Sequence, residues 1–281
     1  MPDCFKTNPH LKRWCTGAAI GLPVLACVAV GPAWSWCLLV SVAAAIGLWE
    51  LHGLLFPDSL SRKWKFVSFA AGLLLPIGTY SCGIAGLNLA LFASFFAALF
   101  TMMLSAPLDR DEIGRIALLA FAWLYLPYFI SFVILVGNAP QGRLWIIFVL
   151  VVIVAGDAGA YHVGVRIGRH RLYEVVSPKK SVEGAIGGLF SSLLTGTIFG
   201  SIFLSHVSLA RLLLYSVVVA SAGQIGDLIE SMLKRNSGKK DSSHLLPGHG
   251  GILDRLDSMI FAFPVMWALL KWVASERWDA F

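Results

Sequence analysis

About nine stretches of roughly twenty mostly apolar residues follow one another along the 281-residue chain, and this pattern limits the fold more than any other feature. A helix of that length spans the hydrocarbon core of a bilayer. The sequence therefore predicts an all-α polytopic integral membrane protein, with a single membrane domain over residues 1–281. The expected helices lie near residues 15–31, 33–55, 66–82, 84–105, 113–136, 144–163, 185–204, 209–233 and 251–273.

The composition supports this fold class. Hydrophobic residues make up 57% of the chain and charged residues only 14%, whereas charged residues are about 25% of a typical soluble domain. The net charge of +6 does not indicate nucleic-acid binding, because basic residues of membrane proteins gather in cytoplasmic loops and contact anionic headgroups. We therefore expect no nucleic-acid partner.

The distribution of Lys and Arg predicts the orientation. With the N-terminus in the cytoplasm, 18 of the 22 Lys and Arg residues are cytoplasmic and 4 are outside. This bias favours a cytoplasmic N-terminus and an outer C-terminus. The polar stretches 164–184 and 234–250 then face the cytoplasm, where nucleotides are available. We expect a multi-pass protein of the cell inner (plasma) membrane, whose first apolar stretch is retained as a helix rather than cleaved as a signal peptide.

Ionisable residues are unevenly spread along the chain. The helices expected within residues 1–135 carry almost no charge and are interpreted as scaffold, whereas residues 156–258 hold the candidate catalytic motifs and loops. Asp227 lies near the end of the eighth expected helix, and Asp254 and Asp257 are three residues apart at the start of the ninth. Carboxylates at membrane depth need a counter-charge. Mg²⁺ or Ca²⁺ suits such an oxygen-rich group, and a salt-bridge network with Arg235 and Arg255 is the alternative.

Two cytoplasmic segments could bind phosphate. In "PGHGG", the glycines precede a helix N-terminus, where exposed backbone N–H groups favour an anion, and Lys239, Lys240 and His249 could add positive charge. An ordinary connecting turn is the alternative. In "SPKKSVEG", Ser177-Pro178 predicts a turn, and the adjacent lysines suit phosphate, although a pair of lysines can simply be a topology signal.

The sixth expected helix adds two candidates. Asp157 and Tyr161 are four residues apart in its cytoplasmic half, and an acid within the membrane is a candidate site residue. Gly164 and Gly168 have the spacing of a close-packing motif. The segments together predict metal-dependent phosphoryl or nucleotidyl transfer to a lipid at the cytoplasmic leaflet.

The stretch "SMLKRNSGKKDSSHLLPGHGGILDRLDS" (231–258) resembles the signature of the phosphatidate cytidylyltransferases, also called CDP-diacylglycerol synthases. "SPKKSVEG" and the "GDAGAY" and "GVRIGR" elements resemble the same family in the same order, so the motifs cover residues 156–258. The resemblance implies that CTP and phosphatidic acid give CDP-diacylglycerol and pyrophosphate with Mg²⁺. It also implies K⁺ beside the Mg²⁺, and a homodimer.

The residues and the resemblance give two sets of expected site residues. The catalytic set is Asp227, Asp254, Asp257, Lys239, Lys240 and Asp241, of which the resemblance makes Asp227, Asp254 and Asp257 the metal ligands. The substrate-binding set is Asp157, Tyr161, Ser177, Lys179, Lys180, Ser181, Glu183, Lys234, Arg235, His249, Gly250, Gly251 and Arg255.

Two other function classes stay open. A cation-coupled transporter also buries acidic residues, although the charges here are gathered in one part of the chain and no inverted repeat is visible. Another CTP-dependent lipid kinase or nucleotidyltransferase is the closer alternative. The Asp-Gly…Ala-Arg…Gly…Asp…Asp pattern of CDP-alcohol phosphotransferases is absent from the sequence.

Overall fold

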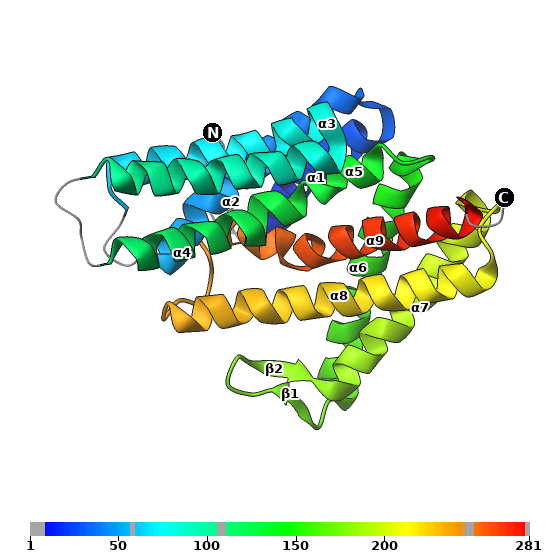
Figure 1. Ribbon diagram of the computed structural model, residues 1–281. Coiled ribbons are helices and arrows are strands. Elements are labelled where there is room, and N and C mark those ends of the chain that lie inside the picture. Colours follow the sequence, from blue (N-terminus) through cyan, green and yellow to red (C-terminus); the bar gives the residue numbers. More distant parts are fainter. Residues whose placement is uncertain (1–8, 57–59, 106–110, 244, 246–249, 279–281) are drawn as a thin grey trace. The chain divides into compact units, whose positions relative to one another are not determined.

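A computed structural model describes residues 9–56, 60–105, 111–243, 245 and 250–278 (Figure 1). Most of this described chain is helical, in agreement with the all-α fold class expected from the apolar stretches. In chain order the elements are α1 (Pro9–Val30), α2 (Ala33–Leu55), α3 (Arg62–Met103), α4 (Glu112–Trp123), the π-helix η2 (Leu124–Tyr128), α5 (Phe132–Gly137), α6 (Gly142–Ile167), β1 (Arg171–Tyr173), β2 (Ser177–Ser181), α7 (Val182–Phe203), α8 (Leu209–Asn236) and α9 (Leu253–Trp278).

Each expected helix overlaps helical residues of the structure. The first two expected helices are separate, because Pro32 between them is extended. The expected helix 113–136 is formed by α4, η2 and α5 in succession, with Pro127 inside the π-helical turn. Proline lacks the backbone N–H needed for regular helical bonding, and a local change of helix type accommodates it.

Helix α3 contains a reversal of the chain. Cys82 and Gly83 leave the helical conformation, and Gly83 has a φ of 61°, which glycine adopts without steric cost. A Cβ atom on Gly78 would lie 2.7 Å from the carbonyl oxygen of Gly86, so the residues before and after the reversal pack against each other. The two segments correspond to the separate helices expected at residues 66–82 and 84–105.

Six helical segments of the described chain are long and apolar enough to cross a membrane. They are Ala33–Leu55, Arg62–Met103, Glu112–Gly137, Gly142–Ile167, Val182–Phe203 and Leu209–Asn236. A polytopic membrane protein is consistent with this result. The number of nine spans and the orientation of the termini stay predictions.

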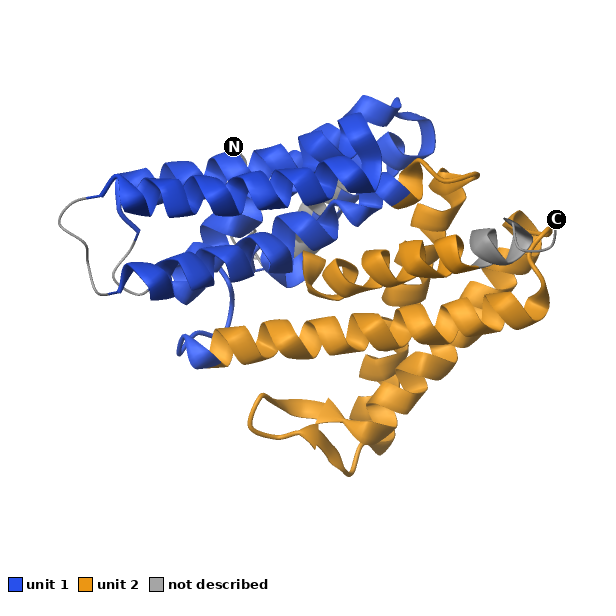
Figure 2. Ribbon diagram, in the orientation of Figure 1, with its two compact units in different colours: residues 1–135, 236–255 blue, residues 136–235, 256–281 orange. Residues whose placement is uncertain are grey.

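The chain divides into two compact units (Figure 2). Unit 1 comprises residues 1–135 and 236–255, and unit 2 comprises residues 136–235 and 256–281. Unit 1 therefore contains the expected scaffold helices together with the segment between α8 and α9 that includes "PGHGG" (247–251), which is called the glycine-rich loop below. Unit 2 contains most of the other expected site residues. The interpretation of the chain as a single membrane domain stays a prediction.

The core of unit 1 forms where α2, α3 and the α4–η2 segment pack together. Leu48, Trp64 and Leu126 are completely buried there. Inside this apolar core the Ser68 hydroxyl lies 2.9 Å from Nε2 of His52 and accepts a hydrogen bond of 3.1 Å from Nε1 of Trp123. Buried polar groups are costly unless they are paired, so this network holds the three helices in one arrangement.

In unit 2, α6 and α7 pack closely along small residues. A Cβ atom on Gly159 would collide with the Ser191 side chain, and Ser192 donates a hydrogen bond of 2.7 Å to the Val152 carbonyl. Small residues let helix backbones approach in membrane proteins. Gly164 lies at the same interface, where its Cβ would be 3.6 Å from Cα of Gly184. The packing role expected for Gly164 is thus confirmed.

The polar segment between α6 and α7 forms an antiparallel hairpin of β1 and β2, which the all-α prediction did not include. The turn is at residues 174–176, and Ser177-Pro178 belongs to β2, so the turn expected at Ser177-Pro178 was wrong. Proline is compatible with a strand that has a free edge, since its missing N–H need not bond there.

Candidate functional site

Unit 2 contains a cavity of about 610 Å³ beside the hairpin. Seven expected site residues line this cavity: Asp157, Tyr161, Ser177, Lys179, Lys180, Ser181 and Asp227. They come from α6, β2 and α8, segments that are far apart in the sequence. The hairpin thus brings the two lysines of "SPKKS" to the acids of two helices.

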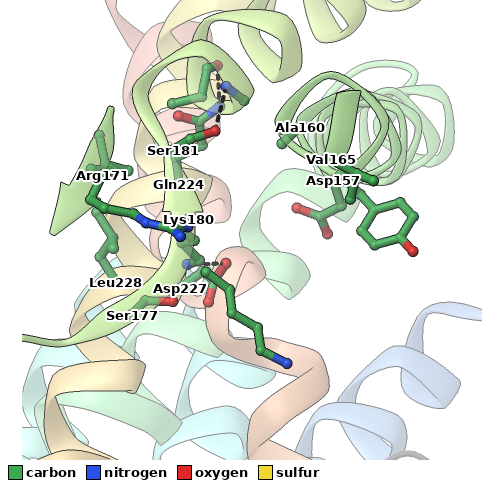
Figure 3. Close-up of a pocket in the computed structure, with 16 residues that line it drawn as sticks. Asp157, Ala160, Val165, Arg171, Ser177, Lys180, Ser181, Gln224, Asp227 and Leu228 are labelled. Carbon is green, nitrogen blue, oxygen red and sulfur yellow. Dashed lines mark hydrogen bonds and ion pairs between the residues drawn. The ribbon is translucent and has the colours of Figure 1, made fainter. Parts of the chain in front are cut away.

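A short ion pair lies in this cavity. Nζ of Lys180 on β2 is 2.5 Å from Oδ2 of Asp227 on α8 (Figure 3). Both side chains are about 30% exposed, at 29% and 30%, so the pair is open to solvent and to ligands. Arg171 on β1 also lines the cavity, and its side chain extends toward Lys180 (Figure 3). Three cationic side chains, those of Arg171, Lys179 and Lys180, are therefore available to an anionic ligand.

Asp257 extends the acidic part of the site. Its carboxylate, on α9, is within electrostatic range of Asp227 and Asp157, which repel it, and of Lys234, which attracts it. Helices α8 and α9 can approach this closely because residue 226 is glycine, where a Cβ atom would collide with the carbonyl oxygen of Asp257. The fold thus places two of the three expected metal ligands, Asp227 and Asp257, within electrostatic range of each other.

The donor set is compatible with Mg²⁺. No group of three Asp, Glu, His or Cys side chains placed to hold a metal ion is found among the described residues. Mg²⁺, however, usually binds one or two protein carboxylates and completes its octahedron with water and substrate phosphates. Asp227 and Asp257 meet that requirement, and their mutual repulsion is of the kind that a cation relieves.

Two expected substrate-binding residues, Ser181 and Glu183, have structural roles where the hairpin meets α7. Ser181 also lines the cavity, whereas Glu183 is not among the residues that line it. Ser181 caps α7 by accepting a hydrogen bond of 3.1 Å from the Gly184 N–H, a common role of serine at a helix start. The Glu183 carboxylate accepts hydrogen bonds from the backbone N–H groups of Arg169 and His170, and lies 2.6 Å from Nδ1 of His170. Glu183 therefore fastens the start of the hairpin to the start of α7.

Lys234 and Arg235 lie near the end of α8. Lys234 forms an ion pair with Glu230, which is completely buried. Arg235 donates a hydrogen bond of 3.1 Å from Nε to the carbonyl of Val176, in the turn of the hairpin. The bond of Arg235 holds the turn of the hairpin to α8, whereas the ion pair of Lys234 lies within α8. A direct contact of either side chain with substrate stays a prediction.

In unit 1, Asp254 is bonded to the glycine-rich loop. Its Oδ2 accepts hydrogen bonds from the Gly251 N–H at 2.7 Å, the Ser242 hydroxyl at 2.9 Å and the Ser242 N–H at 3.1 Å. Gly250 has a φ of 77°, and a Cβ atom there would lie 2.6 Å from the same oxygen. The third expected metal ligand thus has a loop-holding role in this structure.

Glu50 of α2 holds the same loop. It is 2% exposed and accepts hydrogen bonds from the Ser243 hydroxyl and from the N–H groups of Ile252 and Leu253. It also shares the proton of the Ser242 hydroxyl with Asp254. Sequence reasoning missed this residue, because the helices of residues 1–135 were interpreted as scaffold. The available signal was an acid inside an apolar helix, which is costly unless it is paired.

The remaining expected residues of the loop have varied surroundings. Lys239 donates a hydrogen bond of 2.7 Å to the Gly53 carbonyl and, with Glu50, lines a second cavity of about 500 Å³ in unit 1. Lys240, Asp241 and Arg255 are exposed. His249 lies outside the described residues. Sequence reasoning also missed Arg171 and Gln224 as cavity residues. Arg171 lies on β1 and Gln224 on α8, and their positions at the cavity follow only from the packing of the hairpin beside that helix.

Comparison with known proteins gives concordant similarities. A sequence model described as "Cytidylyltransferase family" matches residues 11–273. The chain is 35% identical over 272 residues to a phosphatidate cytidylyltransferase of Bacillus subtilis, which covers 92% of this chain and 97% of that protein. It is 41% identical over 152 residues to the phosphatidate cytidylyltransferase of Staphylococcus saprophyticus, covering 54% of this chain and 58% of the relative. The protein of that name from Staphylococcus epidermidis is 40% identical over 141 residues, which cover 50% of this chain and 54% of the relative.

Proposed function

The chain belongs to the cytidylyltransferase family, and on that premise we propose that it transfers the cytidylyl group of CTP to phosphatidic acid, giving CDP-diacylglycerol and pyrophosphate. One observation indicates which residues take part in the reaction. The cavity of unit 2 places Lys179, Lys180 and Arg171 beside the acidic residues Asp157 and Asp227. Cations suit a triphosphate, and the acids suit the cation that accompanies a nucleotide.

The chemistry is an in-line displacement at phosphorus. A phosphate oxygen of the lipid attacks the α-phosphorus of CTP, the bond from that phosphorus to the bridging oxygen breaks, and pyrophosphate leaves with the bridging oxygen. The lysines and Arg171 bind the triphosphate and neutralise charge on the leaving group. No strong general base is required, because a phosphate monoester is already anionic near neutral pH. The protein's main contribution is therefore positioning and charge neutralisation.

We assign Mg²⁺ to this site, held by Asp227 and Asp257. The role of Asp254 as the third ligand, expected from the family resemblance, stays a prediction. When bound, the ion neutralises phosphate charge and aligns the reacting groups. The ion pair of Lys180 with Asp227 partly neutralises one carboxylate of the site. K⁺ beside Mg²⁺ is part of the proposal on the family resemblance, and no residue is assigned to it.

The membrane arrangement is also part of the proposal. We propose nine crossings, a cytoplasmic N-terminus, an outer C-terminus and a location in the cell inner (plasma) membrane with the site facing the cytoplasm. The reversal at Cys82-Gly83 supports counting α3 as two crossings, and the Lys and Arg bias supports the orientation. A homodimer is proposed on the family resemblance.

The position of the label in CTP tests the reaction. Purified protein in phosphatidic acid vesicles with Mg²⁺ receives CTP labelled either at the α- or at the γ-phosphorus, and the lipids are separated by chromatography. Cytidylyl transfer places only the α-label in lipid, in a product that co-migrates with CDP-diacylglycerol. Labelling from γ-labelled CTP alone would identify a lipid kinase and overturn the proposal. No lipid labelling from either form would leave the transporter class as the better account.

A further inference from the structure

The buried carboxylate of Glu50 and the segment from Ser242 to Leu253 are nearly 200 residues apart in the sequence, with separations of 192 to 203 residues for the four bonded pairs. Oε1 accepts from the Ser243 hydroxyl at 2.6 Å and the Ile252 N–H at 3.0 Å. Oε2 accepts from the Leu253 N–H at 2.7 Å and lies 3.1 Å from the Ser242 hydroxyl. That hydroxyl has one proton, which it shares between Glu50 and Oδ2 of Asp254 at 2.9 Å. Each oxygen therefore joins one end of the glycine-rich loop to the other.

The bonds to Ile252 and Leu253 act on the start of α9. The first N–H groups of a helix have no partner within the helix, and a negative charge beside them is favourable. Glu50 satisfies two N–H groups at this end from a different helix. Because Asp254 follows in the first turn of α9, a fixed helix start also fixes the part of the chain that carries this residue.

The bonding pattern requires a carboxylate at position 50. A serine hydroxyl can reverse its bond and accept, but a backbone N–H can only donate. Each Glu50 oxygen faces one such N–H, so both must be acceptors. Glutamine would place its NH₂ group against one of the two N–H donors, and aspartate is one methylene shorter. The space is also closed by Gly251, where a Cβ atom would collide with the Ser242 hydroxyl and the Glu50 carboxylate.

We propose that Glu50 is a positioning residue for the cytidylyl transfer, which acts by holding Ser242 and Ser243, Ile252 and Leu253, and with them the start of α9. These residues flank the segment expected from the sequence to bind the nucleotide phosphates. This inference rests on the proposed function. It gives a specific role to α2, in the part of the chain that the sequence suggested to be scaffold.

Glu50→Gln tests the inference, with Glu112→Gln as the matched control. Glu112 is also a buried glutamate of unit 1, 4% exposed, but it pairs with Lys63 at 3.1 Å and with Arg115 at 3.7 Å. Hydrogen–deuterium exchange of the full-length protein in detergent follows the amides of residues 250–258, and steady-state kinetics follow CTP at saturating phosphatidic acid. The exchange measurement does not depend on activity. It therefore tests the role of Glu50 in the loop even if the proposed function is wrong. The labelling assay on the wild-type protein tests the proposed function separately.

For Glu50→Gln we expect exchange at residues 250–258 to become at least tenfold faster, a KM for CTP that rises about tenfold, and exchange in α2 and α3 that stays as in the wild type. Glu112→Gln should leave both the loop exchange and the KM for CTP unchanged. A loss of folded enzyme lowers kcat in proportion but does not change KM. The proposal is overturned if Glu50→Gln leaves the KM and the loop exchange at wild-type values, or if exchange rises equally throughout unit 1.

Ser243→Ala provides a second variant should Glu50→Gln not accumulate. It removes the shortest bond to Glu50 but leaves both backbone bonds in place. We expect a local increase of exchange limited to residues 242–253 and a KM for CTP raised two- to fivefold. Wild-type exchange and KM in this variant would contradict the proposal.

Discussion

Lys180 and Asp227 form an ion pair with a separation of 2.5 Å between Nζ and Oδ2. The sequence suggested different ligands for the two side chains, a phosphate for the lysine and a metal ion for the aspartate. Their contact joins the "SPKKS" hairpin to α8, so both ligands would be bound at one place. The pair is partly exposed and contributes little to stability, which leaves it available for exchange with substrate.

Replacement of either hairpin lysine should weaken the use of CTP. Loss of a charge-assisted phosphate contact costs about 1.5–3 kcal/mol, so kcat/KM for CTP should fall roughly 10- to 150-fold in Lys179→Ala and in Lys180→Ala. Because Lys180 also contacts Asp227, the two substitutions should not be additive. The loss of kcat/KM in the double variant Lys180→Ala/Asp227→Asn, as a free energy, should be much smaller than the sum of the losses in the two single variants. Lys63→Ala, in unit 1, is the control and should retain wild-type kinetics. Unchanged kinetics in both hairpin variants would show that these lysines do not bind the triphosphate and serve only to determine the membrane orientation.

The aspartates should differ in their tolerance of asparagine. Asn preserves size but removes the charge that binds the cation, so Asp227→Asn and Asp257→Asn should lower turnover roughly 100-fold or more and raise the Mg²⁺ concentration required. Asp254 bonds the loop mainly through Oδ2, and the carbonyl of Asn can replace that oxygen, so its loss should be smaller. Mg²⁺ titrations of the variants measure this. Near-wild-type turnover and Mg²⁺ dependence at both Asp227 and Asp257 would contradict the metal assignment.

Gly226→Ala should destabilise unit 2. The added Cβ would collide with the Asp257 carbonyl, and overpacking of this kind typically costs about 1–3 kcal/mol. The thermal unfolding midpoint in detergent should therefore fall. In Gly114→Ala, on α4, the Cβ meets no atom within 4 Å, and the midpoint should stay or rise, since alanine gains about 0.4–1 kcal/mol at a compatible site. Equal midpoints for the two variants would show that α8 and α9 do not approach closely at residue 226.

Reporter fusions should establish the orientation. Alkaline phosphatase joined after residue 281 should be active, and green fluorescent protein at the same point should be dark, because each reports one side of the membrane. The control is a fusion after residue 240, in the expected cytoplasmic stretch, where the two reporters should give the opposite result. A brightly fluorescent fusion at the C-terminus would show that the C-terminus is cytoplasmic.

The helices were predictable from the sequence because their signal is local. A run of apolar residues defines a membrane helix without knowledge of its neighbours, and even the paired helices within α3 followed from hydropathy. The hairpin at residues 171–181 was not predictable in this way. Its short strands lack a clear alternation of polar and apolar residues, and Pro178 indicated a turn rather than a strand.

The site residues that belong to charged sequence motifs were predictable. Those whose role depends on contacts between distant parts of the chain were not. Lys179, Lys180, Asp157 and Asp227 were expected, and all four line the cavity. Glu50 was not expected, because its partners lie about 200 residues further along the chain and no spacing rule connects them. Glu183 was expected to touch substrate, but its bonds to Arg169 and His170 show a loop-holding role that only the fold reveals.

The separation between Glu50 and its partners has a consequence for biosynthesis. At about 5–20 residues per second, the ribosome needs roughly 10–40 s to extend the chain from Glu50 to Ser242, given a separation of 192 residues. Throughout that interval helix α2 has a carboxylate without the four donors that later satisfy it. A nascent chain truncated before residue 242 should therefore be a better substrate for membrane quality-control proteases than the finished protein, since its earliest helices still carry an unsatisfied acid.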